Sequence, residues 1–290
     1  STVAMSASRL DRVKSCHFGY FMEYGLRAKE RTSAGFEAPE VGTFIHYLLE
    51  NVNRDVCERG GYGEVDKPAL RQLVHHYVDL YAQTMIDGYD QKGARFRYLF
   101  SRLRETACAI VENIADEMAV SDFRPIAFEL GFGGKDGQLP AITVTEGSTA
   151  LSVRGKVDRV DGWIRDDKLF LRVVDYKSGK KKFDLANVRM GLDIQMLLYL
   201  FTLQKEGARY FGQEIEPAGV LYLPARDEIL SLERNVTPEQ LLREREKTLK
   251  RSGLLLAEPA VLSAMEHDAL TEPHYLPLRV NRSGDLSGSI

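Results

Sequence analysis

The sequence predicts an α/β fold with a helical amino-terminal block. Apolar residues recur with helical spacing in residues 1–122, runs rich in β-branched and aliphatic residues follow in 123–224, and residues 225–290 return to helical and irregular patterns. The chain has 290 residues and is 44% hydrophobic, which is enough to bury a real core. We expect residues 1–290 to form one elaborated domain.

Four segments of the amino-terminal block are predicted to be helices: residues 10–26, 42–58, 68–88 and 95–120. Pro68 suits the first turn of the third helix, and the pair Gly60 and Gly61 suits a stop after the second. His46 interrupts the otherwise apolar pattern of the second helix. Taken alone, a histidine in that setting is usually a core or boundary residue.

Strands are predicted at residues 126–131, 149–157, 169–177 and 219–223. Gly162, Asp166 and Asp167 suit a hairpin loop between the second and third strands, within residues 162–168. A helix is predicted at residues 187–206, before the last of these strands. Farther on, we expect a charged helix at 238–251 and then a proline-punctuated tail, interpreted as mobile or as a truncated boundary.

Polar side chains gather at the end of the third strand. Asp175 and Lys177 are two residues apart and therefore share a face of that strand. An exposed ion pair explains these two residues by themselves equally well. Asp158, however, directly follows the preceding strand, and Gln195 and Tyr199 lie four apart on one side of the next helix. Together these residues favour an active site.

Four short motifs resemble, in order, the nuclease motifs of the RecB-type branch of the PD-(D/E)XK superfamily: GxxxH at 42–46, GxxD at 155–158, DYK at 175–177 and QxxxY at 195–199. Residues 6–31 are also similar to the start of the nuclease domain in AddB-type subunits of bacterial helicase-nucleases. The resemblance, which runs from Ser6 to Tyr199, implies a restriction-endonuclease-like fold with a mixed central sheet flanked by helices.

Phosphodiester hydrolysis needs charge neutralised on the phosphate and a water made nucleophilic, and Mg²⁺ or Mn²⁺ held by carboxylates assists both. Asp158 and Asp175 are the candidate carboxylate ligands. The resemblance adds His46 and the backbone carbonyl of Tyr176, whose side chain is expected to pack on the opposite strand face. An imidazole ligand makes Mn²⁺ a competent alternative to Mg²⁺. Lys177 is expected to orient or deprotonate the attacking water.

The remaining candidates are ranked by their place in the pattern. Gln195 and Tyr199 are expected to position the water, the lysine or a phosphate, or else to pack the polar edge of their helix on the sheet. Asp161 competes with Asp158 for the first acidic role, but lies on the other face if the strand continues. Glu129, in the strand at 126–131, is a weaker candidate for a place near the metal.

The three cysteines argue against a disulfide framework, because they are odd in number and widely spaced. Cys57 and Cys108 are expected to be buried free thiols. Cys16 matches, by resemblance, one cluster ligand of iron-sulfur AddB-type nucleases, but the other three ligands have no counterpart in this sequence. Since such a cluster normally needs four thiolates, no iron-sulfur cluster is expected in this chain.

The formal net charge of −3 argues against a protein that coats DNA nonspecifically, but it allows a local basic groove. Basic residues cluster at 95–104, 180–182 and 243–251. The first and third clusters are predicted to be solvated helix faces with acidic partners, whereas the lysines at 180–182 suit phosphate contact as well as solvent. Without a secretory signal or a membrane-spanning run, the cytoplasm is the expected location.

These observations predict a Mg²⁺- or Mn²⁺-dependent DNA exonuclease domain that acts in double-strand-break repair and recombination. By resemblance it would work beside the helicase subunit of an AddAB-type complex, because the sequence has no GxxxxGK[ST] phosphate loop of its own. Two alternatives stay open. One is a noncatalytic DNA-binding or scaffolding module of such a complex, and the other is a stand-alone nuclease of the CRISPR-adaptation type.

Overall fold

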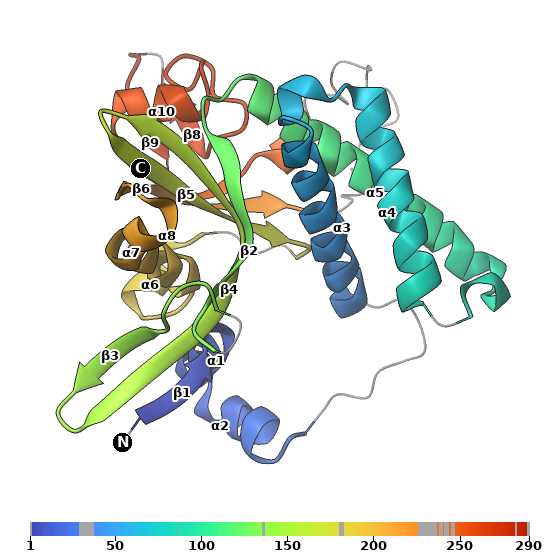
Figure 1. The fold of residues 1–290 in the computed structure, drawn as a ribbon. Helices are drawn as coiled ribbons and strands as arrows, with labels where there is room; N and C mark the ends of the chain where they lie inside the picture. Colours follow the sequence, from blue (N-terminus) through green and yellow to red (C-terminus); the bar gives the residue numbers. More distant parts are fainter. Residues whose placement is uncertain are drawn as a thin grey trace.

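A mixed β-sheet lies at the centre of this computed structural model, with helices on both faces (Figure 1). The structure describes residues 2–28, 38–86, 88–134, 137–179, 183–225, 237, 240, 244, 247–281 and 283–288. The sheet runs through β1 (Thr2–Ser6), β4 (Thr149–Arg165), β5 (Lys168–Lys177), β6 (Glu214–Pro224) and β7 (Ser252–Leu255), while β2 (Arg124–Phe132) and β3 (Ile142–Glu146) pair with β4. β1 with β4 and β5 with β6 are parallel and the other pairs antiparallel, which confirms the predicted fold class.

The β4–β5 hairpin is tighter than predicted. β4 continues through Gly162 to Arg165, and only Asp166 and Asp167 separate it from β5. Both turn residues have positive φ, 51° and 60°, as in the two-residue turns that match the right-handed twist of paired strands. The longer β4 therefore places Asp158 inside a strand rather than after one.

Three long helices form the amino-terminal block: α3 (Ala38–Glu58), α4 (Lys67–Met85) and α5 (Ala94–Ala119), with the short turns η2 (Tyr62–Glu64) and η3 (Tyr89–Gln91) between them. They agree closely with three predicted segments. Asp66 caps α4 by accepting a hydrogen bond from the Ala69 amide at 2.8 Å, and Pro68 lies in the first turn. Gly60 and Gly61, with φ of 102° and 101°, end the α3 region as expected.

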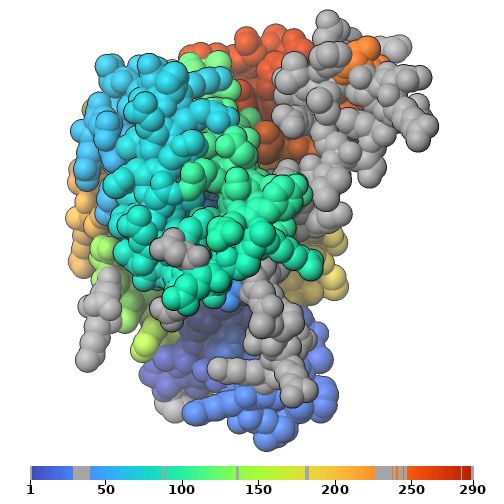
Figure 2. All heavy atoms as spheres, turned by 90° about the vertical axis from the view of Figure 1, so that its right-hand side faces the viewer, coloured from blue at the N-terminus to red at the C-terminus, as the bar shows by residue number. Residues whose placement is uncertain are grey.

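Alternate residues of β5 face two separate cores. Leu171 and Val173 pack with α7 (Gln195–Glu206) on one face, whereas Val174 and Tyr176 pack with α3, α4 and α5 on the other. Viewed from the side of these three helices, they cover the centre of the molecule and the amino-terminal elements lie below them (Figure 2). Burial of each such apolar side chain contributes about 1.5–3 kcal/mol, so both faces anchor β5.

The amino-terminal segment differs from the single helix predicted at residues 10–26. It forms β1 and then α1 (Ala7–Ser15), α2 (His17–Tyr20) and a π-helical turn η1 (Phe21–Gly25). Cys16 has an extended backbone, with φ of −162°, and this interrupts the helix. β1 was not predicted: its five residues are mostly exposed and gain their place by pairing with β4.

The helix predicted at residues 187–206 is also divided, into α6 (Leu185–Arg189) and α7. Gly191 and Asp193 between them have φ of 77° and 55°, a conformation that no α-helix continues through. The Asn187 side chain donates a hydrogen bond to Asp193 at 3.1 Å and closes the loop. As a result Gln195 opens α7, which is followed by α8 (Ala208–Phe211).

The carboxyl-terminal part is more regular than predicted where the structure describes it. It contains β7, α10 (Pro259–Met265), and a two-stranded sheet of β8 (Leu278–Val280) and β9 (Leu286–Gly288). The Asn281 side chain accepts a hydrogen bond from the Asp285 amide at 2.8 Å and fixes the turn between β8 and β9. The expectation of a mobile or truncated tail stays a prediction, and half of the residues of the helix predicted at 238–251 lie outside the described residues.

A network of buried ions joins the sheet to α5. Asp161 lies 2.8 Å from Arg159 and 2.9 Å from Arg172, and Glu117 of α5 lies 3.0 Å from Arg172 and 2.6 Å from Arg251. All five side chains are almost completely buried. Arg251 was predicted to lie on a solvated helix face, and this was wrong, because it directly precedes β7 and its guanidinium points inward to Glu117.

Among the described helices, none is both long enough and apolar enough to cross a membrane. Elsewhere on the surface, Arg104 of α5 pairs with Asp79 of α4, and Lys247 pairs with Glu244 at 2.5 Å. These ion pairs agree with the solvated helix faces expected for Arg104 and Lys247.

Candidate active site

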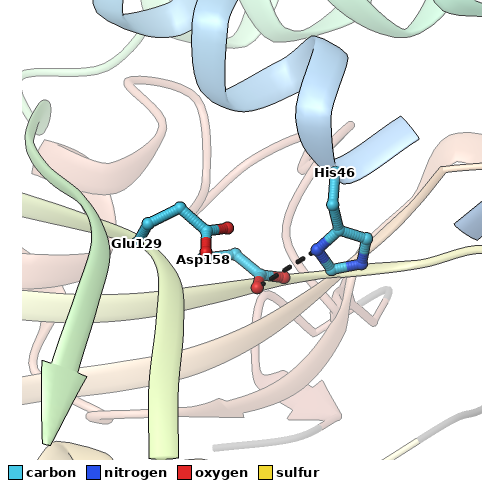
Figure 3. A group of neighbouring side chains, drawn as sticks. All are labelled: His46, Glu129 and Asp158. Carbon is cyan, nitrogen blue, oxygen red and sulfur yellow. Dashed lines mark ion pairs between the residues drawn. The ribbon is translucent and has the colours of Figure 1, made fainter. Parts of the chain in front are cut away.

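Residues from α3, β4 and β5 meet at the end of β5, and Figure 3 shows two of them, His46 of α3 and Asp158 of β4. His46 of α3 has its Nδ1 atom 3.3 Å from Oδ1 of Asp158 and its Nε2 atom 3.1 Å from the backbone oxygen of Tyr176. The other carboxylate oxygen of Asp158 accepts a hydrogen bond from the Tyr176 amide at 2.7 Å. The structure thus brings together three of the four residues predicted as metal ligands.

The glycine of the GxxxH motif lets α3 approach the end of β5. A Cβ atom at Gly42 would lie 3.3 Å from the Ser178 hydroxyl, tighter than ordinary packing. Gly42 is one helical turn before His46, so both residues face the same part of the sheet. The spacing of this motif therefore has a packing reason as well as a chemical one.

The contacts of His46 favour a protonated ring. Its Nε2 atom lies within hydrogen-bond distance of the Tyr176 carbonyl and its Nδ1 atom lies 3.3 Å from the Asp158 carboxylate, and both oxygen atoms are acceptors. Burial lowers the pKa of His46, but the carboxylates of Asp158, Asp175 and Glu129 outweigh it and raise the pKa above its ordinary value. The two contacts and the raised pKa both favour the imidazolium form of His46 among these oxygen atoms.

Asp175 and Lys177 emerge on the same side of β5, as the alternation of the strand predicts. The Lys177 ammonium lies 2.6 Å from Oδ2 of Asp175 and 5.3 Å from the ring centre of Tyr222. Burial, followed by the nearby Asp158 carboxylate, raises the pKa of Asp175 to about 6, although Lys177 and His46 oppose this. A cation bound nearby would therefore favour the ionised form of this buried carboxylate.

Glu129 lies nearer the candidate site than its rank in the sequence suggests. One ligand atom each from His46, Glu129 and Asp158 lie within 4.8 Å of one another (Figure 3). Glu129 also pairs with Lys156 at 2.6 Å, and burial raises the pKa of Glu129. Its φ of 51° falls in the left-handed region, a local distortion of β2 that no residue pattern indicates.

An open pocket of about 450 Å³ lies beside these side chains, lined by Gly42, Thr43, His46, Tyr47, Glu50, Glu129 and Asp158. Sequence reasoning missed Glu50. The signal was available, because Glu50 follows His46 by four residues and so shares its face of α3. The pocket gives the candidate site an opening to solvent of a size that admits a phosphate group.

Gln195 and Tyr199 contact each other at the start of α7. The Gln195 amide donates a hydrogen bond to the Tyr199 hydroxyl at 3.0 Å, and the Tyr199 ring stacks on Phe132 with centres 5.1 Å apart. A Cβ atom at Gly155 would collide with the Tyr199 hydroxyl, so the glycine of the GxxD motif makes room for this tyrosine. The motif glycine and the motif tyrosine are thus direct packing partners.

Substituting Gly155→Ala is expected to displace Tyr199 and to destabilise the protein by about 1–3 kcal/mol through overpacking. The free energy of unfolding in urea would measure the effect. Gly63→Ala is the control, because a Cβ atom there meets nothing within 4 Å, and it should change stability by less than about 1 kcal/mol. Equal stabilities of the two variants would contradict the assigned packing.

Other candidates lie elsewhere in the structure. Asp161 is held by the two arginines of the buried network, which leaves Asp158 as the acidic residue of this segment beside His46. The lysines at 180–182 lie outside the described residues.

The three cysteines differ in burial. Cys108 is buried as expected and Cys57 is only half-buried. Cys16 is exposed, and its sulfur accepts a hydrogen bond from the Gly19 amide at 3.3 Å.

Comparison with known proteins agrees with this geometry. Residues 4–272 match the PD-(D/E)XK nuclease superfamily. Relatives include the B subunit of the ATP-dependent helicase/deoxyribonuclease of Clostridium tetani, 32% identical over 99% of this chain and 25% of the relative, and that of Acetivibrio thermocellus, 34% identical over 97% of this chain and 25% of the relative. The chain spans about a quarter of the length of these curated relatives. It belongs to the PD-(D/E)XK nuclease superfamily.

Proposed function

We propose that this chain is a metal-dependent deoxyribonuclease domain, which acts as an exonuclease beside a helicase subunit in double-strand-break repair and recombination. The observation that carries the proposal is the meeting of His46, Asp158 and the Tyr176 carbonyl next to the Asp175–Lys177 pair. The relatives are named as one subunit of an ATP-dependent helicase/deoxyribonuclease, and this name supports both the DNA substrate and the helicase partner.

The residues at this site fit a divalent cation. His46, Asp158, Asp175 and the Tyr176 carbonyl would hold it, with Glu129 within reach of the same place. One imidazole among several oxygen donors suits Mg²⁺ or Mn²⁺. When bound, the cation would neutralise phosphate charge and lower the pKa of the attacking water.

The side chains around the cation would carry the remaining steps. Lys177 presents its ammonium group at the rim of the site, where it can hold the attacking water and stabilise negative charge that develops on the phosphate. Asp175 orients that ammonium through their 2.6 Å ion pair. The Gln195–Tyr199 pair supports the strand that carries Asp158, because Tyr199 packs on Gly155.

The test is cleavage of linear DNA by the purified chain in Mg²⁺ or Mn²⁺, with products resolved over time. Mononucleotides or short products released from DNA ends are expected, and excess chelator should stop the reaction. Cleavage that persists in chelator would contradict the metal dependence. Salt-sensitive DNA binding with no turnover in any divalent ion would instead favour a noncatalytic module.

Mn²⁺ affinity is expected to fall as the pH drops through about 6. His46 must lose a proton to become a ligand, and the pKa of Asp175 is raised to about 6, so at lower pH protons compete with the cation at both residues. Each displaced proton weakens binding about tenfold per pH unit below its pKa. Calorimetric titrations at pH 5.5 and 7.5 would measure this, and equal affinities would contradict it.

A further inference from the structure

The face of α3 that carries His46 runs beside β5 and also carries a buried asparagine, Asn53. Gly42, His46, Leu49 and Asn53 follow one another at spacings of four, three and four residues, so they form one stripe of the helix. Gly42 lies against Ser178 and His46 lies on the Tyr176 carbonyl. Asn53, about three turns beyond Gly42, reaches the hydroxyl of the same Tyr176.

Asn53 is fully buried, and both ends of its amide have partners. Its nitrogen donates hydrogen bonds to the Tyr176 hydroxyl at 3.2 Å and to the Leu49 carbonyl at 2.5 Å. Its oxygen accepts a hydrogen bond from the Tyr62 hydroxyl at 2.6 Å. A buried amide with this many partners fixes the groups that it contacts, since any shift leaves a polar atom without its hydrogen bond.

Tyr176 connects this amide to the candidate site. The ring of Tyr176 is held by Asn53, while its backbone amide and carbonyl contact Asp158 and His46. The same helix and the same strand residue therefore meet twice, once through the histidine and once through the asparagine. These two contacts, seven residues apart on α3, add two fixed polar points to the apolar packing that holds the helix against the sheet.

We propose that Asn53 is a positioning residue, which sets where His46 stands relative to Asp158 and the Tyr176 carbonyl and thereby sets the affinity of the site for its cation. The inference rests on the proposed function. Residues that orient metal ligands from behind typically change metal affinity by about tenfold to a hundredfold when replaced. Neither the nuclease motifs nor the comparisons assign a role to Asn53.

The matched control lies on the same helix. Asn51 also donates a hydrogen bond from its amide nitrogen to the carbonyl four residues earlier, that of Tyr47, at 2.7 Å. Among the contacts of the described residues, the Asn53 amide donates a hydrogen bond to Tyr176, and the Asn51 amide donates to Tyr47 instead. Asn51→Ala therefore removes the same kind of helix contact and spares the contact with the strand.

The experiment measures Mn²⁺ binding by calorimetry and thermal unfolding for the wild type and for Asn53→Ala, Tyr176→Phe and Asn51→Ala. Asn53→Ala and Tyr176→Phe should raise the Mn²⁺ dissociation constant by about tenfold or more, with maximal cleavage restored at saturating Mn²⁺, while Asn51→Ala binds as the wild type does. Tyr176→Phe keeps the ring, the packing and the backbone ligand and removes the hydroxyl that Asn53 and Arg159 contact, so it tests that hydroxyl even if Asn53→Ala does not fold.

The outcomes separate the two proposals. If the wild type binds Mn²⁺ and folded Asn53→Ala and Tyr176→Phe bind it equally well, the positioning role is wrong and the proposed function stands. The positioning role is also wrong if both variants lose only thermal stability, with no change in the dissociation constant. If the wild type binds no divalent ion, the proposed function fails and the role of Asn53 fails with it.

Discussion

Replacing Asp175 with asparagine should slow DNA cleavage by about a thousandfold, which corresponds to about 4 kcal/mol of lost transition-state stabilisation. Asparagine keeps the shape of the side chain but removes its negative charge. The site then loses one anionic ligand for the cation and the acceptor that holds the Lys177 ammonium at 2.6 Å. Initial rates of nucleotide release at saturating Mg²⁺ would measure the effect.

The loss should come from chemistry rather than from unfolding. Because the folded protein raises the pKa of Asp175 to about 6, above its ordinary value, the charged carboxylate makes the folded state less stable above that pH. Asparagine removes this cost, so the melting temperature at pH 7.5 should not fall. Asp184→Asn is the control, because Asp184 caps α6 by accepting from the Ala186 amide at 2.8 Å and asparagine caps equally well. Cleavage by Asp175→Asn above a tenth of the wild-type rate would contradict the assigned role.

The sequence was most informative where a short pattern has one physical meaning. Helical spacing predicted α3, α4 and α5, and strand alternation placed Asp175 and Lys177 on one side of β5. The positions of Glu129 and Glu50 at the pocket could not be predicted with the same strength. Glu129 depends on a single left-handed residue in β2, and Glu50 on how α3 lies across the sheet. Tertiary packing settles both positions, although the spacing of four residues from His46 does place Glu50 on the same face of α3.

The buried ions show the same limit more clearly. In a strand, arginine and aspartate at alternate positions normally indicate a face in water, as with Arg159 and Asp161. Here α5 covers that face and Glu117 supplies the compensating charge, from a helix more than forty residues earlier in the chain. Arg251 completes the network from the other end of the sequence. Alternating charged residues in a strand indicate an exposed face only where no segment distant in the sequence covers that face with side chains of opposite charge.

Substituting Glu117→Gln is expected to destabilise the protein by about 3–5 kcal/mol, because it leaves the buried guanidinium of Arg251 without its carboxylate and leaves Arg172 with that of Asp161 alone. A loss of that size is a large fraction of the stability of a typical domain. The free energy of unfolding in urea at pH 7 would measure it. Glu112→Gln is the matched control on the same helix, since the Glu112–Arg71 pair, at 2.7 Å, is partly exposed and should contribute less than about 1 kcal/mol.

The pH dependence of stability distinguishes a buried ion from a lost packing contact. Burial raises the pKa of Glu117, but the guanidiniums of Arg251, Arg172 and Arg159 outweigh it and lower the pKa to about 2, from 4.5 in the unfolded chain. The stabilisation is therefore present above pH 4.5 and is lost as the pH falls toward 2, where the unfolded state binds the extra proton. Glu117→Gln cannot take up that proton, so its disadvantage relative to the wild type should shrink across this window. A disadvantage that stays constant from pH 5 to pH 2.5 would show that shape rather than charge holds this network together.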